Sequence, residues 1–286
     1  MNSTSIIKRQ NKPCMLKIQY AARVCYNNAE KSNYIVWFFC LISTFSIFLP
    51  DSLPYHLSFA VPFVADIAAW VLMNVVNRNV GKAAELRKYF DAYSIDIAIN
   101  EFSEAEKRKL IELAEDKYAK NPKQAELQIK NTGNDYPPGV YDWYKFSTKY
   151  EGLKAKFECQ CQNTWWDKKQ FPLKCIVKAI AFVMVVTLFI VLMIHNNFVK
   201  TLLCSAGLLI KLAERMIDGF RYWRVSIEID GAQKMLEAHL TPEGIKELQV
   251  LIDKRRAVNI LGINLLHKKS ANKLTKRYDD ITNLQR

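Results

Sequence analysis

Four long hydrophobic blocks interrupt an otherwise polar chain of 286 residues. The most apolar is residues 175–194, which carry one charge, Lys178, in twenty positions. A helix rises about 1.5 Å per residue, so this block spans about 30 Å, the hydrocarbon thickness of a bilayer. Its Val, Ile, Leu, Phe and Met side chains suit contact with lipid, and the Lys178 ammonium can reach the headgroups from its place near one end. The block predicts a transmembrane helix.

Three further blocks have the length and composition of membrane spans. Residues 34–49 carry no charge, and residues 55–76 carry only Asp66. Residues 198–217 have an uncharged run at 201–210, after which Lys211, Glu214 and Arg215 follow, so their last turns would face a polar lumen or emerge into water. Connectors of five and three residues join the first block to the second and the third to the fourth. The pattern therefore predicts two transmembrane hairpins.

Charge sets the expected orientation of the hairpins. The formal net charge is +13, with six basic residues against one acidic in residues 1–32, 18 against 15 in 78–174 and 15 against 10 in 211–286. The connectors at 50–54 and 195–197 contain no Lys or Arg. Basic flanks of membrane spans stay on the cytoplasmic side. We therefore expect both termini and the middle segment to be cytoplasmic.

The expected fold is a mainly α membrane protein whose four transmembrane helices form two hairpins. A mostly helical cytosolic domain is expected from the middle segment and the two termini. In chain order, the divisions are a cytosolic N-terminal helix at 1–32, hairpin 1 at 33–77 (spans 34–49 and 55–76), a cytosolic sensor or regulatory segment at 78–174, hairpin 2 at 175–217 (spans 175–194 and 198–217), and cytosolic C-terminal helices with a tail at 218–286.

Helix signals are clear in the cytosolic segments. Ser103 opens a capping box, Pro122 follows a helix break and starts another helix, and Thr241 stands before a proline as a helix N-cap. Helical spacing of apolar residues in 77–92 continues the second span into the cytosol, and the fourth block is expected to run on as a helix past Arg224.

The motifs that carry common chemistry are absent from the sequence. It has no Gly-rich dinucleotide or phosphate loop, no HExxH and no GxSxG, so we expect neither an enzyme nor a cofactor. Seven cysteines are an odd number, at mostly membrane or cytosolic positions, which argues against a disulfide framework. Cys159 and Cys161 have the spacing of half a metal site, but no second Cys or His pair completes it, and no metal is expected.

Three charged residues in the hydrophobic blocks are candidate pore-lining groups. Asp66 is the twelfth of twenty-two residues in its span, near mid-bilayer, where a carboxylate costs a few kcal/mol unless it faces a bundle interior, a partner or water. Lys211 and Glu214 are three residues apart and could pair on one helix face. The alternative is that Asp66 is protonated or bonded between helices, while Lys211 and Glu214 lie outside the bilayer.

Several short sequence motifs, taken in their order along the chain, resemble those of a known family. They surround the four spans and are Arg9-Gln10-Asn11, AARVCY at 21–26, KYFD at 88–91, Asp142-Trp143-Tyr144, CQCQN at 159–163 and Trp166-Asp167. This order resembles the SMODS-associated four-transmembrane (S-4TM) effectors of bacterial anti-phage defence.

The resemblance implies a pore-forming or membrane-disrupting effector in the bacterial inner (cell) membrane. In such systems a partner nucleotidyltransferase makes a cyclic di- or oligonucleotide, which the effector binds before it breaches the membrane. The implied partners are the lipid bilayer, this nucleotide and further copies of the chain, with no DNA. Basic and aromatic side chains suit phosphates and bases. The candidate ligand-binding residues are Arg9, Gln10, Asn11, Arg87, Lys88, Asp91, Trp143, Tyr144, Gln160, Asn163, Trp166 and Asp167.

Two other functions fit the same spans. A constitutive channel or transporter would move a solute without an activator, although paired inverted repeats and broken spans are not evident in the sequence. A membrane-anchored scaffold would use the spans only as a tether for a protein-binding cytosolic domain. For the aromatic clusters at 141–144 and 165–166, packing in a core remains the alternative to stacking on a ligand.

Overall fold

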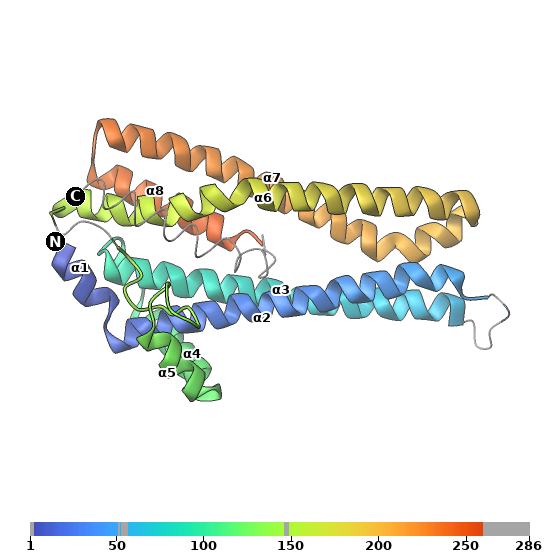
Figure 1. The fold of residues 1–286 in the computed structure, drawn as a ribbon, viewed down its shortest axis with the longest axis horizontal. Coiled ribbons are helices and arrows are strands. Elements are labelled where there is room, and N and C mark those ends of the chain that lie inside the picture. The colour runs from blue at the N-terminus through green and yellow to red at the C-terminus, as the bar shows by residue number, and fades with distance from the viewer. Residues whose placement is uncertain (1–2, 51, 53–56, 146–148, 260–286) are drawn as a thin grey trace.

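Long helices form an elongated molecule (Figure 1). The computed structural model describes residues 3–50, 52, 57–145 and 149–259, without the side chains of 166–167, 170–174 and 177–178. Every regular element in these ranges is helical. The elements are α1 (Ser3–Gln10), α2 (Pro13–Phe45), η1 (Ser46–Phe48), α3 (Leu57–Ser94), η3 (Ile99–Glu101), α4 (Glu104–Lys120), α5 (Pro122–Lys130), α6 (Gly152–His195), α7 (Phe198–Ala238) and α8 (Pro242–Ala257).

Two pairs of long helices dominate the fold. Helices α2 and α3 run side by side, α6 and α7 form a second pair, and the turns of both pairs lie at the same end of the molecule (Figure 1). Two apolar stretches, Pro13–Phe48 and Leu57–Ser94, are long enough to cross a membrane. The apolar part of α6 that is described, Ala179–His195, is somewhat shorter.

The helices do not stop where the predicted membrane segments end. α3 continues to Ser94 and α7 to Ala238, which confirms that the second and fourth blocks extend as helices beyond their apolar parts. α6 begins at Gly152 and passes without a break into the third block. Each hairpin therefore contributes rigid helices to the opposite end of the molecule, where α1, α4, α5 and α8 pack (Figure 1).

The predicted helix starts are confirmed by their hydrogen bonds. The Ser103 hydroxyl accepts from the Glu106 amide, and the Glu106 carboxylate accepts in turn from the Ser103 amide at 2.8 Å. The Asn121 side chain caps α5 with Pro122 in the first turn, and the Thr241 hydroxyl accepts from the amide of Gly244. These caps satisfy helical N–H groups that lack partners within the first turn.

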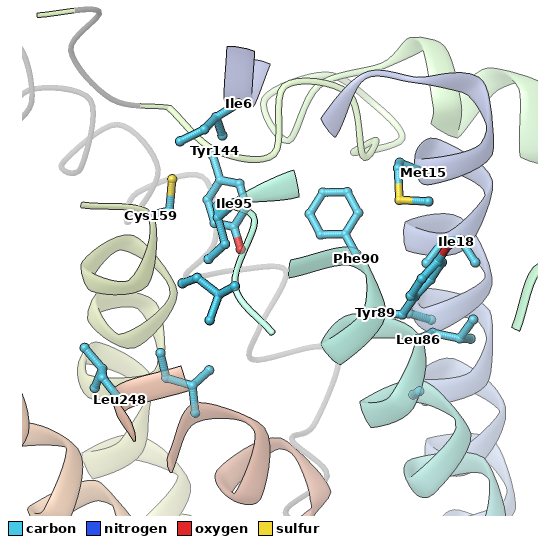
Figure 2. Close-up of a cluster of buried hydrophobic side chains, with 14 of the residues drawn as sticks. Ile6, Met15, Ile18, Leu86, Tyr89, Phe90, Ile95, Tyr144, Cys159 and Leu248 are labelled. Carbon is cyan, nitrogen blue, oxygen red and sulfur yellow. The ribbon is translucent and has the colours of Figure 1, made fainter. Parts of the chain in front are cut away.

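Buried apolar side chains concentrate away from the hairpin turns. Figure 2 shows Tyr144 near Ile6, Ile95 and Phe90, and the Phe90 and Tyr144 rings stack with centroids 6.0 Å apart. The hairpin halves instead leave large apolar side chains exposed, among them Phe38, Phe63, Trp70, Val183 and Ile194. So many exposed apolar side chains are unfavourable in water and suit lipid or another apolar partner.

Candidate functional site

Side-chain amides hold the segment 142–145 from both sides. The Gln10 amide accepts from the Tyr144 backbone N–H at 2.8 Å and donates to the Tyr144 carbonyl at 3.2 Å. Asn11 accepts from the Asp142 N–H at 3.1 Å. On the other side, Gln162 of α6 accepts from the Lys145 N–H at 2.8 Å and donates to the Trp143 carbonyl at 2.9 Å. These bonds replace the backbone partners that an irregular segment lacks, so α1 and α6 fix the path of this loop.

Tyr144 leads from this loop into a buried polar cluster centred on Asp91 of α3, which is fully buried. The Tyr144 hydroxyl donates to Asp91 Oδ1, and Asn163 of α6 donates to the Tyr144 oxygen at 2.9 Å. From α8, Arg256 donates to Asp91 Oδ2 at 2.6 Å and Gln249 donates to the same oxygen at 3.0 Å. A buried carboxylate requires such donors, since an unpaired charge in a low-dielectric interior is strongly unfavourable.

Electrostatics tie the cluster together. Burial lowers the pKa of Arg256, but the charges of Asp91 and Asp253 outweigh burial and raise it. Burial raises the pKa of the Tyr144 phenol well above its usual value, and the Asp91 charge adds to this effect. Asp253 accepts from Arg256 at 3.3 Å and from Gln249 at 3.1 Å, and burial raises the pKa of its carboxyl to about 6 despite the Arg256 charge.

A second arginine supports the loop through a ring contact. The Arg87 guanidinium lies 4.1 Å from the centroid of the Trp143 ring, a cation–π arrangement. Burial lowers the pKa of Arg87, and the nearby Arg256 charge adds to the shift. Arg9 lies farther out, 3.3 Å from the Asp96 carboxylate and 4.8 Å from the Tyr93 ring.

Most of the candidate ligand-binding residues therefore gather at one place, where they bind each other. Gln10, Asp91, Tyr144 and Gln160 are buried, and Gln160 donates to the Ile245 carbonyl at 2.8 Å. The same arrangement includes Asn11, Arg87, Trp143 and Asn163. The side chains of Trp166 and Asp167 lie outside the described residues. Direct ligand contact by these residues stays a prediction, while their observed bonds join four separate segments.

Lys88 differs, because it faces an open groove beside the cluster. This basic groove, of about 350 Å³, is lined by Lys88, Phe102, Lys246, Gln249, Asp253 and Lys254, among others. The Lys88 ammonium lies 5.4 Å from the centroid of the Phe102 ring. Lys246 pairs with Glu101 at 2.5 Å. Gln249, which donates to Asp91, and Asp253, which accepts from Gln249 and Arg256, belong to both the groove and the polar cluster. A molecule in the groove would therefore touch side chains of the cluster.

The α8 members of the cluster were not anticipated from the sequence. Gln249, Asp253 and Arg256 follow the apolar stripe of α8 along the helix, near buried Ile245 and Ile252. The sequence did contain a signal: these polar residues lie on the same face of the helix as its apolar residues. A helix face that is buried at one turn is commonly buried at the next, so their burial could have been predicted.

A comparison with family models identifies the family. The family model described as the SMODS-associating 4TM effector domain matches residues 4–209, well over half of the chain. The chain belongs to this family. Comparisons with curated proteins and with solved structures find no match. Membership makes the chain a membrane protein, and α8 and most of α7 (residues 210–238) lie beyond the matched residues.

In this S-4TM protein, two of the candidate pore-lining residues lie where α7 meets the first hairpin. Asp66 of α3 packs against Gly207 of α7, close to the Ser43 hydroxyl, and its buried Oδ1 has no well-aligned hydrogen bond to a described residue. Lys211 is buried and donates to Met73 Sδ at 3.3 Å. We call this α3–α7 contact the seam.

The third candidate, Glu214, lies elsewhere. It lines a cavity at the ends of the predicted spans that lie away from the hairpin turns, and the described salt bridges do not include a Lys211–Glu214 pair. A pore-lining role for any of the three stays a prediction. Their positions nevertheless differ: Asp66 and Lys211 face the neighbouring hairpin, whereas Glu214 lies at the predicted membrane boundary.

Asp91→Asn should destabilise the protein by ~3–5 kcal/mol, because it removes one partner of a buried ion pair and leaves Arg256 beside Asp253 alone. Thermal unfolding of the detergent-solubilised protein measures the effect. The matched control is Asp96→Asn. Asp96 forms a more exposed pair with Arg9, so this variant should lose ~1 kcal/mol of unfolding free energy or less. Equal losses from both variants would contradict the role given to Asp91.

Asp253 should make stability depend on pH. Its folded pKa of about 6 lies above the ordinary value of 3.8, so the charged form is disfavoured in the folded state. Stability should therefore rise as pH falls from above 6 toward 4, and the gain should be smaller in Asp253→Asn. The difference between the unfolding midpoints of the two proteins across pH 4–8 gives the test. A difference that does not change with pH would show that Asp253 titrates normally.

Gly207→Ala should weaken the seam. A Cβ at Gly207 would lie 2.7 Å from Asp66 Cγ, closer than side chains tolerate, and such overpacking costs ~1–3 kcal/mol. Gly219→Ala, in the same helix, meets nothing within 4 Å and should stabilise by up to ~1 kcal/mol through helix propensity. Unfolding midpoints of both variants in one detergent test this, and a neutral Gly207→Ala would refute the close approach.

Proposed function

We propose that this S-4TM protein is an anti-phage effector that self-assembles and permeabilises the bacterial inner membrane when a cyclic di- or oligonucleotide binds its cytosolic side. In this proposal the chain crosses the membrane four times with both termini in the cytoplasm. The observation that carries it is the convergence of α3 and α6, one helix from each hairpin, on the polar cluster around Asp91. Family membership supports the class of effector.

This convergence supplies a mechanical link. Asp91 lies three residues before the end of α3, which is one unbroken helix from Leu57, and Asn163 lies on the helix that ends at His195. Both reach Tyr144, and α8 closes the cluster through Arg256. A ligand that moves α8 or the 142–145 loop would shift both hairpins, provided that it binds one arrangement better than the other.

The basic groove is the proposed place for the activator. A cyclic nucleotide needs cations for its phosphates and a ring face for its bases, and the groove offers Lys88 and Lys254 near the partly buried Phe102 ring. No carboxylate within salt-bridge distance of Lys88 appears among the described ion pairs, so this ammonium is free to meet a phosphate. Phosphate binding there would act on Asp253 and Gln249, and through them on Asp91.

Self-assembly follows from the apolar surfaces. One chain with four spans is too small to enclose a wide pore, and the hairpins present exposed apolar faces on α3 and α6. Such faces suit lipid in a resting chain and other copies in an assembled one. Asp66 and Lys211, at the seam, would reach an aqueous path only if α7 moves relative to α3.

Reporter fusions test the proposed topology. A periplasm-active phosphatase inserted at Asn196 should be active, since this connector carries no Lys or Arg. The same reporter inserted at His239, between α7 and α8, should be inactive. The reverse pattern, or activity at both positions, would overturn the arrangement of two hairpins inserted from the cytosol.

Liposome leakage tests activation. Purified protein should release an entrapped dye only when one member of a panel of cyclic di- and trinucleotides is added. Lys88→Ala should raise the half-maximal nucleotide concentration about tenfold, the equivalent of losing one charge-assisted hydrogen bond. Lys109→Ala, on exposed α4, is the control and should leave it unchanged.

Two leakage results would contradict the proposal. Leakage without nucleotide would favour the constitutive channel. Absence of leakage with the whole panel would favour a scaffold that uses its spans as a tether.

A further inference from the structure

A second cavity lies where two predicted spans leave the membrane. It has a volume of about 510 Å³ and is lined by residues of α3, α7, α8 and the two residues after α8, including Asn77, Arg215, Arg221, Lys254 and Asn259. Asn77 directly follows the predicted span 55–76, and Arg215 and Arg221 bracket the end of the predicted span 198–217. In the proposed topology, this boundary cavity lies at the depth of the cytoplasmic lipid headgroups.

Aromatic side chains mark the same depth independently. Phe220 and Trp223 of α7 are 61% and 48% exposed, and their ring centroids are 5.8 Å apart. Exposed Trp side chains are enriched at the membrane–water interface, where an apolar ring meets lipid and the indole N–H meets water. They stand on either side of Arg221 in sequence, which places the cavity beside this aromatic pair.

The cavity is equipped to hold an anion. Arg215 is largely buried, donates to the Asn259 carbonyl at 2.6 Å and pairs with Asp218 at 3.0 Å, yet its buried Nε has no hydrogen-bond partner among the described residues. Arg221 is mostly exposed, and its guanidinium is 4.0 Å from the same Asp218, at the outer limit of a salt bridge. Lys254 reaches the cavity from α8. Glu214 and Asp218 stand on the wall as well, and the Lys254 ammonium lies 3.7 Å from Glu228 outside the cavity. The donors available to an anion are therefore chiefly the two guanidinium groups.

We propose that the boundary cavity binds the phosphate of an anionic phospholipid from the cytoplasmic leaflet, with Arg215 and Arg221 as its main donors. Guanidinium groups match phosphate oxygens with paired hydrogen bonds, and basic pockets between spans on the cytoplasmic side are suited to lipid headgroups. The acyl chains would continue over the exposed apolar residues Met216, Ile217 and Phe220. This inference rests on the proposed topology and does not depend on a cyclic nucleotide.

Short-chain lipids added to the full-length protein in a neutral detergent test the site. Dihexanoyl phosphatidylglycerol should raise the unfolding midpoint, and dihexanoyl phosphatidylcholine should raise it much less. Arg221→Gln should increase the phosphatidylglycerol concentration needed for half of the effect about fivefold. Arg224→Gln removes the same charge one turn away on α7, where Arg224 pairs with Glu228 outside the cavity. This control should change the half-effect concentration of phosphatidylglycerol less than twofold.

Three results would overturn the site. Equal effects of Arg221→Gln and Arg224→Gln would mean general surface charge. An equal rise in the midpoint with glycerol 1-phosphate or inorganic phosphate would identify a site for soluble phosphates. An equal response to the two lipids would remove the anion preference. Leakage by cyclic nucleotide in an Arg221→Gln protein that has lost its lipid preference would leave the proposed function intact, so the two ideas fail separately.

Discussion

The buried ion pair between Asp91 and Arg256 is the constraint on which the rest of the arrangement depends. A fully buried carboxylate has to be surrounded by donors, and its donors come from α8 and, through Tyr144, from the 142–145 loop and α6. Because Asp91 is near the end of the long helix α3, this local requirement fixes the ends of α3 and α6 that lie away from the hairpin turns relative to one another. The side-chain amides of Gln10 and Gln162 extend the same control to the loop.

The hydrophobic pattern was sufficient to predict the long helices but not the arrangement of the polar cluster around Asp91. Blocks of apolar residues, short connectors and caps at Ser103 and Thr241 depend on local sequence, and the described helices start where these signals stand. The phrases around Gln10, Asp91, Tyr144 and Asn163 were identified through their family order, and the structure brings them together. Their shared environment could not be foreseen, because it depends on α8, whose residues Gln249 and Arg256 lie more than 150 positions after Asp91 in the sequence.

The contact between the two hairpins also could not be predicted from the sequence. Asp66 was recognisable as an intramembrane acid, but nothing local indicated that Gly207 would be its neighbour, since a glycine in a helix has several uses. Lys211 and Glu214 share a helix face, yet one is buried against Met73 and the other lines the boundary cavity. Lys254 lines both the basic groove and the boundary cavity, so one face of α8 lies between the proposed nucleotide and lipid sites.

The central claim is that the polar cluster transmits ligand binding to the two hairpins. The most direct measurement is the distance between spin labels at Phe48 and Phe198, exposed residues next to the two hairpin turns, in liposomes with and without the activating cyclic nucleotide. The labels should be introduced as non-natural amino acids, because seven native cysteines are present. The account predicts that nucleotide changes this distance in the native protein and not in a folded, nucleotide-binding Asp91→Asn variant. An equal change in both proteins would contradict it.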